Sequence, residues 1–123
     1  MAKFVFVGEQ RSGRAKLLGV TWHEGRLAAK PLFDALKAIG IEPERQRFYN
    51  WFESDVLEIA RKLRNMWLDG YTIVAMGRKV QAEMVKHDIP HVFIVHPAAR
   101  GKIRLRENYQ AHVRQQLGEY IGE

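Results

Sequence analysis

The chain has 123 residues, of which 46% are hydrophobic and 28% charged, so we expect residues 1–123 to form a single globular domain. It contains no cysteine, which excludes disulfides, thiolate zinc sites, cysteine-ligated iron–sulfur clusters and cysteine nucleophiles. The net charge of +6 favours an acidic partner, and nucleic acid is the commonest one. No apolar run approaches the ~18 residues of a membrane helix, and no signal-peptide pattern is present. We therefore expect a soluble, cytoplasmic protein.

The first part of the chain predicts a strand, a helix and a second strand. Residues 3–7 form a short β-branched and aromatic run that ends at Gly8. Apolar residues at helical spacing predict a helix over 27–39. Residues 47–49 are a weaker strand candidate, which leads directly to Asn50.

A second helix is predicted over residues 55–68. Asp55 and Glu58 have the spacing of a capping box, in which side chains satisfy the first backbone N–H groups of a helix. Apolar residues at helical spacing mark one face, which we expect to pack on a sheet. That face consists of Val56, Ile59, Leu63, Met66 and Trp67. We also expect the aromatic residues Trp51, Phe52 and Trp67 to lie in the core.

The second half of the chain repeats the strand and helix pattern. Strands are predicted over 71–76 and 91–95, and a helix over 78–87 lies between them. A final amphipathic helix follows over 105–121. Four strand–helix units with nearly continuous apolar strands predict a parallel sheet covered by helices on both faces.

Polar residues follow each of the four predicted strands. In open parallel sheets, ligands bind beyond the carboxyl ends of the strands. We therefore expect an amide, an imidazole, a carboxylate and cations to converge at one edge of this sheet. The residues concerned are Gly8, Glu9, Gln10, Arg11, Asn50, Gly77, Arg78 and His96.

The last strand ends in His96-Pro97 and continues into a small, basic loop. The cations Arg100, Lys102, Arg104 and Arg106 follow the histidine closely, which favours binding of an anionic polymer such as DNA. A buried strand that merely ends in His-Pro is the simpler alternative.

The order of these motifs resembles the uracil-DNA glycosylase superfamily, above all its small microbial branches with a Gly-Glu-Ala-Pro-Gly loop. The resemblance implies a three-layer α/β/α fold with sheet order 2-1-3-4. It also implies extrusion of uracil or a modified pyrimidine from DNA and hydrolysis of its N-glycosidic bond, with no metal or other cofactor. The matching stretches are Gly8-Glu9-Gln10 with Gly13, Phe48-Tyr49-Asn50, Val74-Ala75-Met76-Gly77-Arg78 and His96-Pro97-Ala98-Ala99-Arg100.

The resemblance also implies a role for individual residues. His96 would stabilise the departing base anion, and Asn50 would read the edge of the extruded base. Gly8 and Gln10 would line the base site, and Trp22 is the nearest aromatic on which a base would stack. Residues 98–104 would enter the duplex, with Arg100 filling the gap left by the base.

Two departures from the family pattern keep other readings open. Gln10 stands where the family usually has the water-activating Asp or Asn, and a Gln side chain is no general base. Glu9 would then have to serve as the base, and Arg11 replaces the proline of the loop. The alternatives are a DNA- or base-binding module on the same fold and a small-molecule α/β hydrolase. A solvated ion pair for Glu9, a turn role for Asn50 and a surface role for His96 are the matching alternatives for single residues.

The other histidines have no spacing typical of a metal site, so we expect no metal ion. They are interpreted as structural or surface residues: His23, His87, His91 and His112.

Overall fold

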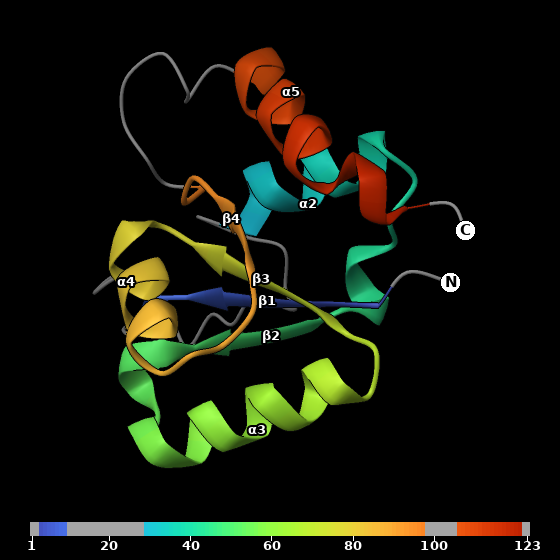
Figure 1. Ribbon diagram of the computed structural model, residues 1–123. Coiled ribbons are helices and arrows are strands. Elements are labelled where there is room, and N and C mark those ends of the chain that lie inside the picture. Colours follow the sequence, from blue (N-terminus) through green and yellow to red (C-terminus); the bar gives the residue numbers. More distant parts are fainter. Residues whose placement is uncertain (1–2, 10–28, 98–105, 122–123) are drawn as a thin grey trace.

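A single four-stranded parallel sheet forms the centre of the protein (Figure 1). The computed structural model describes residues 3–9, 29–97 and 106–121. The strand order is β2-β1-β3-β4, which confirms the expected parallel sheet and its order 2-1-3-4. The strands are β1 (Phe4–Gly8), β2 (Arg47–Asn50), β3 (Thr72–Met76) and β4 (Val92–Ile94).

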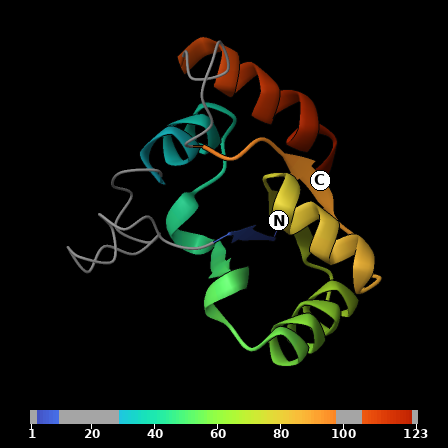
Figure 2. The ribbon, with the colours of Figure 1, turned by 90° about the vertical axis from the view of Figure 1, so that its left-hand side faces the viewer.

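Helices cover both faces of the sheet, so the described residues form three layers (Figures 1 and 2). One face carries α2 (Ala29–Ala38) and α5 (Arg106–Leu117), and the other carries α3 (Val56–Leu68) and α4 (Arg78–Lys86). Short 3-10 turns are η2 (Pro43–Arg45), η3 (Trp51–Glu53) and η5 (Gly118–Tyr120). No helix in the described ranges combines the length and the hydropathy needed to cross a membrane.

Strand β1 is buried on both faces because it lies inside the sheet and between the two helical layers. Phe4 and Phe6 point to the α2 and α5 side, whereas Val5 and Val7 point to the α3 and α4 side. All four side chains are inaccessible to solvent. This two-sided burial explains why the strand reads as an unbroken apolar run rather than an alternating one.

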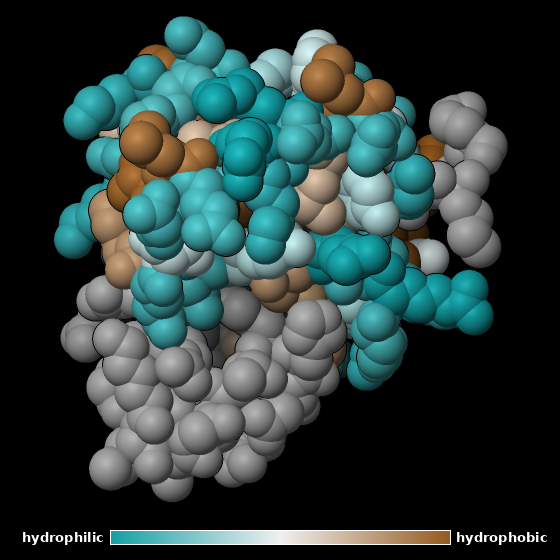
Figure 3. Space-filling view, turned by 90° about the horizontal axis from the view of Figure 1, so that it is seen from below, coloured by the Kyte–Doolittle hydropathy of each residue, from teal (hydrophilic) through white to brown (hydrophobic). Residues whose placement is uncertain are grey.

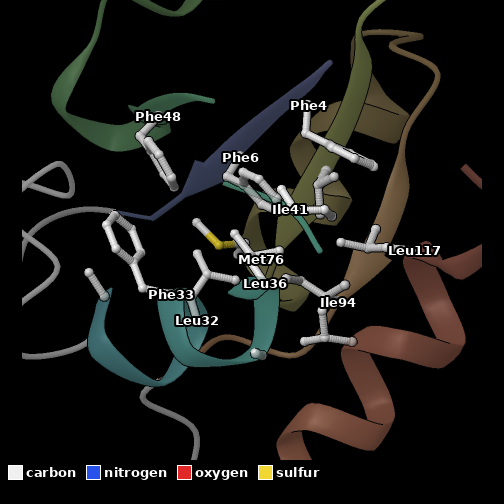
Figure 4. Close-up of a cluster of buried hydrophobic side chains, with 14 of the residues drawn as sticks. Phe4, Phe6, Leu32, Phe33, Leu36, Ile41, Phe48, Met76, Ile94 and Leu117 are labelled. Carbon is white, nitrogen blue, oxygen red and sulfur yellow. The ribbon is translucent and has the colours of Figure 1, made fainter. Parts of the chain in front are cut away.

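Aromatic side chains join β1, β2 and α2 on the first face (Figure 4). The Phe6 and Phe48 rings stack with their centroids 5.4 Å apart, and the Phe33 ring lies 5.5 Å from that of Phe48. Such pairs contribute about 0.5–1.5 kcal/mol beyond the apolar area that they bury. They hold the edge strand β2 against α2.

Gln46 is a buried polar residue that ties the start of β1 to the turn before β2. Its side-chain oxygen accepts a hydrogen bond from the Phe4 N–H (2.9 Å), and its amide nitrogen donates to the Glu42 carbonyl (3.1 Å). The side chain therefore satisfies backbone groups where the β1–β2 ladder begins, at Val5 and Arg47.

The expected apolar face of α3 is only partly buried. Ile59 and Leu63 pack on the sheet as predicted, but Val56 is 37% exposed and Trp67 is 47% exposed. A 13-residue helix is about 20 Å long, whereas a five-residue strand spans only about 16 Å, so the helix ends extend beyond the sheet.

The aromatic residues expected in the core also divide between core and surface. Trp51 is completely buried, as predicted. Phe52 is 46% exposed, so the prediction that Phe52 and Trp67 lie in the core was wrong for both residues. Viewed from the α3 side, the apolar residues form separate patches within a mainly hydrophilic surface (Figure 3).

Strand β4 differs from the buried strand expected over residues 91–95. It spans only Val92–Ile94 and lies at the edge of the sheet, so Val92 and Phe93 are half-buried and Ile94 alone is fully buried within it. The strand ends before Val95 because the backbone groups of Val95 bond to side chains of α5 instead of to a strand.

The start of α3 offers a direct test of the predicted helix cap. The Asp55 side chain accepts a hydrogen bond from the Glu58 N–H (3.0 Å) and so satisfies one of the free donors of the first turn. We expect Asp55→Ala to lower the free energy of unfolding by about 1 kcal/mol, measured by urea denaturation. Asp55→Asn keeps the acceptor and should stay near the unchanged protein. An equal loss in both variants would contradict the capping role.

Candidate functional site

The carboxyl ends of the four strands lie at one side of the sheet, which faces the viewer in Figure 2. Gly8 and Asn50 end β1 and β2 and are partners in the parallel register. The Phe52 N–H donates to the Glu9 carbonyl (2.8 Å), so the segments that leave these two strands remain together. The Gly77 N–H donates to the Ile94 carbonyl (3.0 Å) and connects the ends of β3 and β4 in the same way.

Gly77 brings Glu9 and His96 close to each other. A Cβ atom on Gly77 would lie 3.2 Å from a carboxylate oxygen of Glu9 and 3.6 Å from Cβ of His96. Gly77 also has φ 102° and ψ 158°, a conformation that is essentially restricted to glycine. The structure thus confirms that residues following β1, β3 and β4 converge, and we name them the Glu9–Gly77–His96 group.

The electrostatics of this group favour a neutral imidazole beside a carboxylate. Burial lowers the pKa of His96, and the nearby negative charge of Glu9 raises it by a smaller amount, so the net shift is downward. At neutral pH the ring therefore carries one N–H donor and one unprotonated nitrogen. Glu9 lies at the N-terminus of α4, where the helix dipole favours a negative charge.

Asn50 lies at the same edge, at the position that precedes η3. Its side chain makes no capping hydrogen bond to that turn, although its backbone carbonyl accepts one from the Ser54 hydroxyl (2.9 Å). Helix α3 is capped by Asp55 instead. The Asn50 side chain therefore caps neither η3 nor α3.

Arg78 begins α4 next to Gly77, and two contacts orient its side chain. The guanidinium lies 4.4 Å from the centre of the Phe93 ring, and Nη1 donates to the side-chain oxygen of Gln81 (3.2 Å). Cation–π and hydrogen-bond contacts of this kind orient an exposed arginine without neutralising its charge.

Arg106, the first residue of α5, is also exposed. The remaining predicted site residues lie outside the described residues: Gln10, Arg11, Trp22, Arg100, Lys102 and Arg104.

Two residues beside the site were not recognised from the sequence. The Val95 N–H donates to Nε2 of His112 (2.9 Å), and the Tyr109 hydroxyl donates to the Val95 carbonyl (2.9 Å). Tyr109 falls within the amphipathic helix predicted over residues 105–121 without any role of its own, and His112 was interpreted as a structural or surface residue. The sequence did offer one signal: Tyr109 and His112 stand three positions apart on a helix expected to face the core, and each side chain ends in a polar group that needs a hydrogen-bond partner.

Within the described ranges, no cluster of three or more His, Asp or Glu residues is arranged to hold a metal ion. No protein-family model matches the chain, and a search of curated proteins finds no significant match. What the site does must therefore be argued from the residues that the fold brings together.

The close approach at Gly77 predicts an effect that differs from that of other glycines. Gly77→Ala should lower the free energy of unfolding by about 1–3 kcal/mol through its backbone conformation alone. It should also displace Glu9 or His96 and shift the pKa of His96, measured by NMR titration. Gly70→Ala is the matched control, because Gly70 has a φ of +95° but no atom within 4 Å of the added Cβ. A His96 pKa that responds equally to both substitutions would refute the close contact.

Proposed function

We propose that this protein is a uracil-DNA-glycosylase-like hydrolase that removes uracil or a modified pyrimidine from DNA. The observation that carries the proposal is the Glu9–Gly77–His96 group, which places a neutral imidazole and a carboxylate at the carboxyl edge of a parallel sheet. The family resemblance of the motifs and the net charge of +6 support the same conclusion.

The proposed reaction replaces the bond between C1′ of the sugar and the base with a bond to water oxygen. The electron pair of the broken bond leaves with the base, and negative charge develops on the base O2. The neutral His96 donates a hydrogen bond to that oxygen, while Glu9 accepts a proton from the attacking water. The products are an abasic site and a base anion. The anion takes up a proton from solvent, and Glu9 releases its proton to solvent.

Asn50 and Arg78 supply recognition in this proposal. One side-chain amide offers both a donor and an acceptor, which matches the edge of an extruded uracil. Arg78 is exposed at the start of α4, beside Gly77, where its charge is available to a DNA phosphate.

A binding module that holds DNA or an extruded base without cleaving it is the second candidate. Gln10 is the observation that favours it, because a Gln side chain does not remove a proton from water. The two candidates differ in whether the unchanged protein cleaves the base from DNA. Cleavage that Glu9→Gln abolishes supports the first candidate, and DNA binding without cleavage by the unchanged protein supports the second.

Removal of the imidazole tests the proposed chemistry. Duplex oligonucleotides that contain uracil, hypoxanthine or hydroxymethyluracil are incubated with the protein and treated with alkali to reveal abasic sites. We expect His96→Ala to reduce cleavage by about 10²–10³ and to change DNA affinity only a few-fold. His91→Ala, at the opposite end of β4, is the control and should retain activity. Equal losses of rate and affinity in His96→Ala would make His96 a binding residue instead.

The DNA partner is tested independently of catalysis by the salt dependence of binding. Each phosphate contact releases counterions, so log affinity should fall linearly with log salt, by about 0.9 per contact. We expect a slope of roughly −3 to −4, and Arg78→Ala should reduce its magnitude by about 1. Lys86→Ala, at the other end of the same helix, should leave the slope unchanged. Absence of DNA binding at low salt would exclude both candidates and leave a small-molecule hydrolase.

A further inference from the structure

The residue that connects β4 to His96 is held by α5 rather than by the sheet. The Ile94 carbonyl accepts from Gly77 and so faces β3, whereas the next residue, Val95, uses both of its backbone groups away from the sheet. Because β4 is an edge strand, no further strand lies there among the described elements. The side chains of Tyr109 and His112 take the place of that missing strand.

We infer that Tyr109 and His112 are positioning residues, which hold the Val95 peptide and thereby set where the His96 imidazole lies against Glu9 and Gly77. This inference rests on the proposed function, because it assigns His96 a position that matters for catalysis. It also makes the geometry of the site depend on the ionisation of His112.

The pair is well suited to hold a peptide in one place. Both side chains come from one helix, their ring centroids are 6.3 Å apart, and one accepts from the Val95 N–H while the other donates to its carbonyl. Tyr109 is buried, as are Val113 and Leu117, which anchor α5 in the core beside α2. Burial also raises the pKa of Tyr109 far above its usual range, so the hydroxyl remains a donor.

The contact to His112 requires an unprotonated ring nitrogen, because the Val95 N–H donates to Nε2. Burial lowers the pKa of His112 below its ordinary value of 6.5, so the ring is neutral at pH 7. Acidification below the lowered pKa protonates the ring, and two donors then face each other across the contact. The contribution of this contact is therefore complete at neutral pH and is lost as the pH falls through the lowered pKa.

Charged groups on the described elements around α5 do not offer another explanation of this dependence. Within the described residues, burial is the single cause of the His112 shift. The groups on the elements packed against α5 are Lys30, Asp34 and Lys37 of α2, Glu119 and Tyr120 of η5, and His91 and His96 beside β4. Those on α5 itself are Arg106, Glu107, Tyr109 and Arg114, of which Arg114 donates to the Ala38 carbonyl (3.4 Å).

Four variants of the full-length protein test the inference. His112→Gln retains an acceptor but does not titrate, His112→Leu removes the acceptor, and Tyr109→Phe removes the donor. His91→Gln is the matched control directly before β4, since His91 contacts the Ile89 carbonyl. Between about pH 5 and pH 8, NMR records the hydrogen exchange of the Val95 amide, corrected for its intrinsic pH dependence, and the titration of the His96 ring.

We expect His112→Leu to raise Val95 exchange roughly tenfold and to shift the His96 titration, with Tyr109→Phe acting in the same direction. In the unchanged protein, protection of Val95 should fall as His112 protonates, and in His112→Gln it should stay constant with pH. His91→Gln should behave like the unchanged protein. If Val95 exchange and the His96 titration are the same in all variants, the inference is wrong. Should His112→Leu not fold, Tyr109→Phe and His112→Gln decide the question.

Activity then separates this inference from the proposed function. If the protein is a glycosylase, His112→Leu should lower kcat by about 10–100-fold with little change in KM, and His112→Gln should restore most of it. Unchanged kcat in an active protein would refute the positioning role and leave the glycosylase intact. An inactive protein in which Val95 protection and the His96 titration still follow His112 would refute the glycosylase and leave the positioning role intact.

Discussion

Burial of β1 on both faces is the constraint on which the rest of the structure depends. Its phenylalanines need the α2 and α5 layer, and its valines need the α3 and α4 layer, so neither layer can be removed without exposing the core. All the neighbouring strands run parallel to it, which means that every strand ends at the same edge. Glu9, Asn50, Gly77 and His96 meet there although they are far apart in the sequence.

Two opposing effects, burial and the charge of Glu9, determine the protonation state of His96. Burial acts on its pKa more strongly than the charge of Glu9 does, and the imidazole therefore stays neutral at pH 7. A neutral ring keeps one N–H donor beside the Glu9 carboxylate, and the proposed hydrolysis assigns these two groups separate roles as hydrogen-bond donor and base.

The two sides of the site are supported differently. The residues after β1 and β2 are held by backbone bonds, through the paired strand ends and the contact of Phe52 with Glu9. On the other side, β4 has a single strand neighbour, and the peptide before His96 depends on two side chains of α5. Backbone pairing does not change with pH, whereas a bond to an imidazole does, so the two sides respond differently to acid.

Local patterns in the sequence were sufficient to locate the strands, the helices and the Asp55 cap, although not the ends of β4, because each depends on residues only a few positions apart. Convergence at one edge followed from the parallel sheet, and the strand order came from the family resemblance and is confirmed by the structure. The tertiary structure alone decided that Phe52 and Trp67 are exposed, since helical periodicity gives the direction of a side chain but not the extent of the sheet beneath it. It alone showed that Val95 bonds to residues 14 and 17 positions away, and that the missing side chain of Gly77 lets Glu9 and His96 approach each other. Contacts of this kind depend on how complete elements pack, and no periodicity along the chain encodes them.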